Sequence, residues 1–342
     1  MKCHVVLFVT CFSLLLPTLA TAHHSPFLYF NPAQTVELEG EISNLRWRNP
    51  HVMITLETNE GSTYEVEANS LSILQRMGID REVFASGTRV KVAGWPSVRG
   101  VNEIFVTNLL QANGTEVIMF PGSPAVWADE TEGDSTRWLV TEDSLGENNS
   151  DAEGIFHVWA TSLANPGEVL IFDRYNFDLT EQAEKARAEY DIFSNVTLNS
   201  CEDKGMPFLM EQPYPMQFAK GENAILMHME EGDMLRVFDM SADADYSDRE
   251  PIPLGYSTGR WEGETLVVTT VNSSWTTIDV TGVPSAPETI FVEQFIPSES
   301  GQRLDYRLTI TDPNLFNSPQ TFTKYWLWVP GEKVEPFNCV TD

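Results

Sequence analysis

Alternating hydrophobic and polar positions mark five strands in the first third of the chain. Residues 35–47 read TVELEGEISNLRW, and HVMITLET and STYEVEAN repeat the alternation on either side of an NEG turn. The period then changes, because Ser70 can cap a short helix that ends before Gly78. Strands return at TRVKVAGW and EIFVTNLLQ. Three strands, a helix and two strands are the order of an OB-fold, so we expect an OB-like five-stranded barrel over residues 23–120.

A second β-rich unit is expected over residues 155–342. GIFHVWA and GEVLIF have the composition of strands, and LTEQAEKARAEYD predicts a helix capped by Thr180. Seven further apolar stretches follow, which are YPMQFAK, NAILMHME, MLRVFDM, GRWEGETLVVTTV, ETIFVEQFIP, RLDYRLTIT and FTKYWLWV. Strands at this spacing predict an antiparallel barrel or sandwich, so the expected fold class is mainly β. We interpret residues 121–154 as an acidic linker with one short strand at RWLV.

Acidic residues outnumber basic ones by a margin that argues against two classes of partner. The chain has 50 Asp and Glu against 21 Lys and Arg, which gives a formal net charge of −29. Proteins bind phosphate backbones through Lys and Arg, so this charge argues against nucleic acid and against anionic lipid as partners. A surface that stays soluble in salty surroundings would have the same composition.

Residues 1–22 have the pattern of a secretory signal peptide. Lys2 precedes the apolar run VVLFVTCFSLLLPTL, and ATA at 20–22 is a cleavage site. Cleavage there would make His23 the first residue of a periplasmic or secreted protein, and no later stretch is apolar for long enough to span a membrane. Export would leave Cys201 and Cys339, which an oxidising compartment favours as a disulfide.

Two parts of the chain resemble exported bacterial families. The run from HHSPF through TVELEGEI, LRWRNPHVMI and RVKVAGWP resembles small exported proteins that begin with His-His-Ser and carry a W-x-N-P-H-V element. The second half, with PYPM, LGYSTGRWEGETLVVTT, TITDP and a terminal Cys, resembles another exported β-rich family. Its relatives often carry a histidine before a VVERF-like strand, whereas Pro284 stands near that place here, so no catalytic histidine carries over. Both families are largely uncharacterised, so the resemblance implies architecture more than an activity.

Three histidines suggest a metal site in the first unit. His51 follows the run WRNP, where it would open the second strand at the mouth of the barrel. An N-terminal arm that folds back would bring the amine and ring of His23 to the ring of His51, with His24 as a fourth ligand. These nitrogen ligands suit copper or zinc. The alternative interpretation is a solvated chain start at His23 and His24, with His51 as a capping or packing residue.

Two motifs in the second unit are candidates for a catalytic or a ligand-binding site. GYSTG matches G-x-S-x-G, but no helix follows it and the last histidine, His228, precedes Ser257. We therefore interpret its glycines as shaping a loop and hairpin. Arg260 and Trp261 are better candidates for binding a ligand, because Arg can bind a carboxylate and Trp can form the wall of a pocket. The alternative is a stacked Arg–Trp pair that closes a barrel end.

Together these patterns favour an exported binding protein over an enzyme. It would bind copper or zinc through the three histidines, and a small apolar or carboxylate-bearing molecule in the second unit. The enzyme alternatives are a copper-dependent oxidoreductase and an acid–base enzyme that uses carboxylates near strand ends. Those carboxylates are Asp279, Glu288, Glu293 and Asp312. A third alternative is an envelope protein that docks a partner, since OB barrels often serve as binding surfaces. No catalytic residue and no oligomeric state is predicted.

Overall fold

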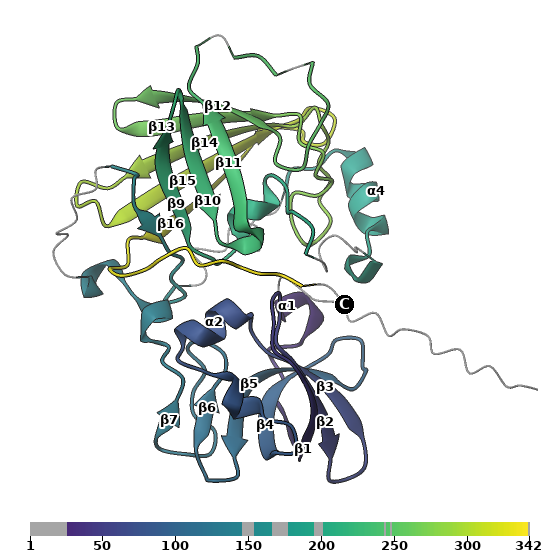
Figure 1. Cartoon of the computed structure of the whole chain (residues 1–342). Helices are drawn as coiled ribbons and strands as arrows, with labels where there is room; N and C mark the ends of the chain where they lie inside the picture. The colour runs from purple at the N-terminus through teal and green to yellow at the C-terminus, as the bar shows by residue number, and fades with distance from the viewer. Residues whose placement is uncertain are drawn as a thin grey trace, which may run out of the picture.

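Two β-barrels follow one another along the chain (Figure 1). The computed structural model describes residues 26–145, 154–165, 177–194, 201–242, 244–246 and 248–340. Strands make up 40% of the chain and helices 14%, which confirms the mainly β fold class. The expected signal peptide and the expected strand at GEVLIF lie outside the described residues.

The first barrel has the strand order of an OB-like fold. Its strands are β1 (Val36–Arg46), β2 (Met53–Thr58), β3 (Thr63–Glu67), β4 (Arg89–Pro96) and β5 (Glu103–Gln111). β1 pairs with β2 and β4, β2 with β3, and β4 with β5, all antiparallel. A parallel pairing between β3 and β5 closes the barrel. The helix α1 (Pro26–Tyr29) precedes these strands.

Glycine permits close approach between strands at two bends of this barrel. A Cβ at Gly40 of β1 would lie 2.2 Å from the carbonyl oxygen of Glu57, and one at Gly94 of β4 would lie 2.2 Å from that of Phe105. The register shifts just after the first glycine and just before the second. A small barrel needs sharply bent strands, and a bulge beside a glycine supplies the bend.

The helix α2 (Leu71–Arg76) joins β3 to β4 and has the cap that the sequence predicts. The Ser70 hydroxyl accepts a hydrogen bond from the Ile73 backbone N–H at 3.3 Å, and Gly78 follows the helix with a φ of 74°. Ile73 and Leu74 are buried in the barrel core. The strands contribute apolar residues to the same core, among them Ile42, Ile54, Leu56, Val66, Val92, Ile104, Val106 and Leu109.

Much of the expected acidic linker is folded onto the first barrel. The strand β6 (Glu116–Ile118) extends the sheet beyond β5, and β7 (Thr131–Glu132) pairs with β6. The strand predicted at RWLV is wrong, because those residues lie in and directly after a 3₁₀ helix at Thr136–Leu139. Asp134 accepts a hydrogen bond from the Thr136 backbone N–H at 2.8 Å, which turns the chain here. The turn still buries the Trp138 ring in the core, so burial of this side chain does not require a strand.

The second barrel is a nine-stranded sheet that is nearly closed. Its strands are β8 (Val158–Trp159), β9 (Met216–Gly221), β10 (Ala224–Met229), β11 (Met234–Asp239), β12 (Tyr256–Glu262), β13 (Thr265–Val271), β14 (Ile290–Pro297), β15 (Arg303–Thr311) and β16 (Gln320–Leu327). Neighbours are antiparallel except β11 and β12, which share a short parallel pairing. Ala160 exchanges backbone hydrogen bonds of 2.8 and 2.9 Å with Leu327, which brings the two edges together. The unit is therefore a barrel rather than a sandwich.

Large side chains make the interior of the second barrel a packed core. They include Trp159, Phe218, Phe238, Phe291, Phe295, Tyr306 and Trp326, all buried. Outside the barrel, α4 (Glu181–Glu189) has the predicted cap, since the Thr180 hydroxyl accepts a hydrogen bond from the Ala183 backbone N–H at 3.3 Å. Within the described ranges, no helix has both the length and the apolar character needed to cross a membrane.

The end of the chain returns to the first barrel as a strap, which we define as residues 332–340. Figure 1 shows this yellow segment running between the two barrels. The Asn49 side-chain amide donates a hydrogen bond to the Phe337 carbonyl oxygen, and the Phe337 ring is buried in the first barrel's core. Cys339 forms a disulfide with Cys201, with Cα atoms 5.7 Å apart, which confirms the predicted pairing.

Buried ion pairs tie α2 of the first barrel to the second barrel and to the strap. Arg76 pairs through both terminal nitrogens with Glu230, and its Nε lies 3.1 Å from a carboxylate oxygen of Glu332. Its guanidinium also donates to the Lys333 carbonyl oxygen at 3.0 Å. The Glu230 and Glu332 side chains are 0% and 1% exposed, so water does almost nothing to stabilise their negative charges. Arg76 is therefore the main cation that neutralises this interface, together with Arg137 on Glu332.

Replacing Arg76 is predicted to destabilise the protein strongly. Arg76→Met would leave the buried Glu230 without its cation, which costs about 3–5 kcal/mol of unfolding free energy. Chemical denaturation measures the change. The matched control is Arg260→Met, since the exposed pair of Arg260 with Glu262 is worth less than about 1 kcal/mol. Equal losses in the two variants would contradict the account of the interface.

Removal of the disulfide is predicted to lower stability without abolishing the fold. The bridge spans 138 residues of chain, and restriction of the unfolded chain by so long a loop is worth about 2–5 kcal/mol. The double variant Cys201→Ser and Cys339→Ser should lose that much in denaturant titrations, and adding reductant should not change it further. A wild-type protein whose stability is the same in reductant would contradict the prediction.

Candidate functional site

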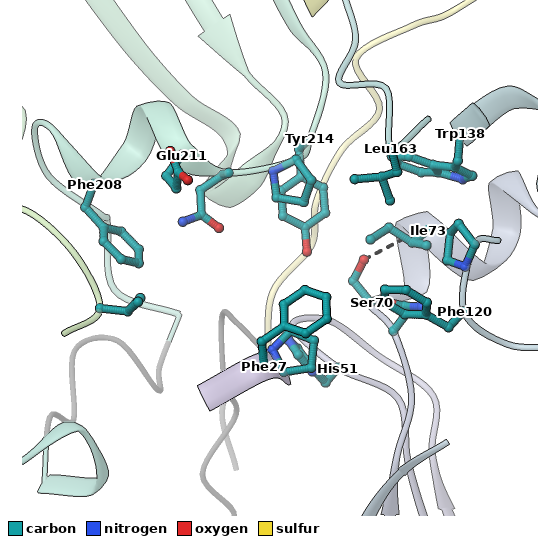
Figure 2. A pocket seen from close by; sticks show the side chains of 16 residues that line it. Phe27, His51, Ser70, Ile73, Phe120, Trp138, Leu163, Phe208, Glu211 and Tyr214 are labelled. Carbon is teal, nitrogen blue, oxygen red and sulfur yellow. Dashed lines mark hydrogen bonds between the residues drawn. The ribbon is translucent and has the colours of Figure 1, made fainter. Parts of the chain in front are cut away.

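A cavity of about 180 Å³ lies where the two barrels meet (Figure 2). Five aromatic side chains contribute to its wall: Phe27, Phe120, Trp138, Phe208 and Tyr214. Its aliphatic wall includes Ile73, Leu163 and Val280, and its polar residues are His51, Asn69, Ser70, Glu211 and Gln212. Small-molecule sites are commonly mostly apolar concave surfaces with a few polar groups, and domain boundaries are a preferred place for them.

The first barrel supplies one wall from loops at a single end. Ser70 sits between β3 and α2, and Ile73 lies on the first turn of α2. The Asn69 side-chain amide donates to the Met119 carbonyl oxygen at 2.8 Å, which ties this loop to the segment after β6. Because that segment continues into Phe120, the loop and the aromatic wall are held together. The wall is therefore built on hydrogen-bonded backbone rather than on a loose loop.

His51 lies just before β2 and is paired with a buried carboxylate. Its Nδ1 lies 2.5 Å from a carboxylate oxygen of Glu67, and the two side chains are 8% and 4% exposed. The β2–β3 register accounts for the pairing, since Met53 is opposite Glu67 and His51 precedes Met53 by two residues. A carboxylate on one ring nitrogen fixes the orientation of an imidazole and leaves Nε2 for another partner.

Tyr214 belongs to the second unit and contributes to the cavity wall. Figure 2 shows its hydroxyl pointing into the middle of the pocket, on the same side as Ser70. The Tyr214 ring packs edge-on against Phe337 of the strap, with ring centroids 5.1 Å apart. Burial raises the pKa of Tyr214 well above its ordinary value, and the charge of Glu231 raises it further. The hydroxyl is therefore neutral.

The predicted histidine ligands are only partly described. His23 and His24 lie outside the described residues, while His51 lines the cavity. In the described part of the chain, no three His, Cys, Asp or Glu side chains are grouped as a metal site would require. Pro26 and Phe27, at the start of the described chain, also line the cavity.

The other candidate residues lie in the second barrel, away from the cavity wall. Arg260 and Trp261 stand at the exposed end of the β12–β13 hairpin, where Arg260 pairs with Glu262 at 2.7 Å. Trp261 is 42% exposed, and its ring lies 6.3 Å from that of Phe156. The two side chains are adjacent in sequence but are not among the residues that line the interdomain cavity. The prediction that they bind a ligand stays a prediction.

Ser257 belongs to a buried polar cluster inside the second barrel. Arg236 donates to both carboxylate oxygens of Glu293, at 2.9 and 2.5 Å, and the Tyr306 hydroxyl donates to the same carboxylate at 2.9 Å. Ser257 is hydrogen-bonded to Thr270 at 2.8 Å. This serine lies in the strand β12, not at a strand-to-helix turn. Apart from Arg236 Nε, which has no hydrogen-bond partner among the described residues, the cluster has the bonding of a structural network.

A second cavity of about 210 Å³ lies where β11 and β12 diverge, but its polar groups are already engaged. Arg236 on its wall is held by Glu293, and Asp239 accepts a hydrogen bond from the Tyr246 hydroxyl at 2.6 Å. Few polar groups are left there to orient a ligand. The interdomain cavity is therefore the better candidate site.

Sequence reasoning missed Tyr214, Trp138 and Glu67 as site residues. The NEG turn sets the β2–β3 register, so the contact between His51 and Glu67 could have been found by pairing the two strands. No comparable local signal places Tyr214 beside Ser70, because 143 residues separate them and their contact depends on how the two barrels dock.

Comparison with known proteins matches part of the chain to one family. A family of unknown function, DUF6152, matches residues 13–104, which include β1 to β4 and the first residues of β5. No curated protein matches the chain. The N-terminal part thus resembles a family whose members have no assigned activity.

Proposed function

We propose that the protein is an exported binding protein whose interdomain cavity holds one small, mostly apolar molecule. The observation that carries this proposal is the cavity itself, with five aromatic rings and few polar groups in its wall. An engineered apolar cavity of about 150 Å³ binds benzene, so about 180 Å³ suits a molecule with a single ring. Export rests on the signal-like pattern of residues 1–22.

The position of the cavity favours a ligand-binding site over a catalytic site. Its wall combines residues of both barrels and is fixed by the Arg76 ion pairs and the strap, so the site is preformed. The ring of His51 is held by Glu67, and the Ser70 side chain is held by its cap of α2, which suits recognition of a ligand. The enzyme and partner-docking alternatives have no comparable feature in the described residues.

Small aromatic molecules are predicted to bind and stabilise the wild-type protein. Toluene at 100 times its dissociation constant would add about 2.7 kcal/mol to the unfolding free energy, visible as a rise in Tm. Val280→Trp should fill the cavity and weaken toluene binding at least about tenfold, whereas the exposed Val98→Trp should not. Calorimetric titration of the three proteins provides the comparison. Toluene binding that is unchanged by Val280→Trp would place the ligand elsewhere.

A second proposal is a copper or zinc site formed by His23, His24 and His51. Two observations favour it: Glu67 leaves Nε2 of His51 for a ligand, and Pro26 lines the same cavity as His51. Three residues of extended chain reach about 10 Å, so His23 could approach His51. Imidazole and amine nitrogens suit both metals, which would add Lewis-acid or redox chemistry to the site.

Metal binding is predicted to need both a processed N-terminus and His51. Protein that begins at His23 should bind Cu(II) or Zn(II) tightly in a calorimetric titration, since amine and imidazole nitrogens converge. His51→Ala and a variant with one extra residue before His23 should each weaken binding at least about tenfold. The control is His228→Ala, whose histidine lies on β10 of the second barrel. Affinity that survives both changes would show that other groups bind the metal.

A further inference from the structure

Gln212 is a polar residue of the cavity wall whose side-chain amide forms no hydrogen bond with the residues that the structure describes. It directly follows the 3₁₀ helix Phe208–Glu211, and its backbone N–H donates to the Leu209 carbonyl oxygen at 3.3 Å. The residue is only 4% exposed, so bulk water does not surround the amide. A buried amide needs partners, and the cavity that Gln212 lines is where they can lie.

Three other polar residues of the wall select a ligand less sharply. The Asn69 amide donates to the Met119 carbonyl oxygen at 2.8 Å, and the Ser70 hydroxyl accepts a hydrogen bond from the Ile73 backbone N–H at 3.3 Å. The Tyr214 hydroxyl can rotate to donate or to accept, so it suits ligands of either kind.

The remaining polar groups of the wall are held by the protein or enclosed in it. The ring of His51 lies against the Glu67 carboxylate, with 2.5 Å between Nδ1 and an oxygen, and Glu211 interacts with other residues of the protein. Trp138 Nε1 has no hydrogen-bond partner in the described part of the chain, but this atom has almost no accessible surface. A ligand would reach it only if the wall moved, so the choice of ligand falls to Gln212.

A carboxamide side chain selects a ligand by its paired donor and acceptor. Its edge presents an N–H beside a carbonyl oxygen, and either orientation of the amide offers the same pair. A ligand that satisfies both groups carries an acceptor beside a donor, which is the pattern of another carboxamide. A ketone or a carboxylate offers acceptors alone and would leave the Gln212 carbonyl oxygen buried without a donor. None of the described wall residues is Lys or Arg, so a carboxylate would also lack a cation there.

We propose that the ligand is a neutral aromatic carboxamide, with a single ring and one amide group, which pairs with the Gln212 amide through two hydrogen bonds. This inference rests on the proposed binding function and names its ligand class. The ring lies among the five aromatic side chains of the wall, where offset and edge-on contacts stabilise it. Affinity for the ring comes from these walls, and selectivity for the amide comes from Gln212.

Benzamide and acetophenone test the proposal as a matched pair, because they have the same shape and acetophenone has a methyl group in place of the amide NH₂. Wild-type protein should bind benzamide at least about tenfold more tightly in calorimetric titrations, because acetophenone leaves the Gln212 carbonyl oxygen unpaired. Equal affinities would overturn the assignment of a carboxamide while leaving the proposed binding function intact. Failure of benzamide, acetophenone and toluene to bind would contradict the binding function itself.

Benzoate provides a second comparison with the same ring. It should bind more weakly than benzamide, since it has no N–H donor for Gln212 and meets no Lys or Arg among the described wall residues. The reverse order of affinities would overturn the proposal.

Substitution of Gln212 locates the amide contact. Gln212→Met keeps the length of the side chain but removes its donor and acceptor, so the preference for benzamide over acetophenone should fall to within about twofold of none. Gln217→Met changes an exposed glutamine on β9 and is the matched control, which should keep the full preference. A preference that survives Gln212→Met would overturn the role of Gln212.

The stability of the variant without ligand is an independent readout. Because Gln212→Met removes an amide that has no hydrogen bond to the described residues, the variant should unfold at the wild-type Tm or above it. Benzamide should raise the Tm of the wild-type protein and raise that of the variant less. A variant that melts well below the wild-type protein, or does not fold, would show that the amide bonds within the protein and would overturn the proposal.

Discussion

The pairing of Arg76 with Glu230 and Glu332 is the interaction on which the arrangement of the two barrels depends. One guanidinium at the end of α2 contacts a carboxylate of the second barrel and a carboxylate of the strap. Both carboxylates are almost fully buried, so separating the barrels would expose these charges to water or leave them buried without a cation. The Glu335 backbone N–H also donates to Glu230 at 3.0 Å, which adds the strap to the same network. A buried network of this kind specifies one docking geometry rather than many.

This docking geometry creates the candidate site. Tyr214 and Phe337 of the second unit are buried in the same core as the first barrel's strands, so the two units share apolar packing beside the ion pairs. The cavity lies at this seam, and neither barrel encloses it alone. The first barrel contributes His51 and Ser70 and the second contributes Tyr214 and Phe208. Function thus follows from the contact between the barrels more than from either fold.

Local patterns in the sequence predict most of the secondary structure. The β5 stretch EIFVTNLLQ coincides with the observed strand Glu103–Gln111, and Ser70 caps α2 as its position suggests. The cysteine count, together with the expectation of export, predicts the disulfide that the structure has. The docking contacts do not follow from the sequence, because Arg76 and Glu332 are 256 residues apart and the strap EKVEPFNCV has no periodic pattern. The RWLV segment shows a limit of local patterns. Its apolar residues suggest a strand, whereas the chain forms a 3₁₀ helix there that buries Trp138 in the core.

The most direct test of the central claim, that the seam between the barrels is the ligand site, is to locate a bound ligand. A crystal of the protein soaked with bromobenzene would give an anomalous signal at the bromine position. The account predicts a single strong peak within the wall formed by Phe27, Phe120 and Tyr214. A peak at the Arg260–Trp261 hairpin or in the cavity between β11 and β12, with none at the seam, would contradict it.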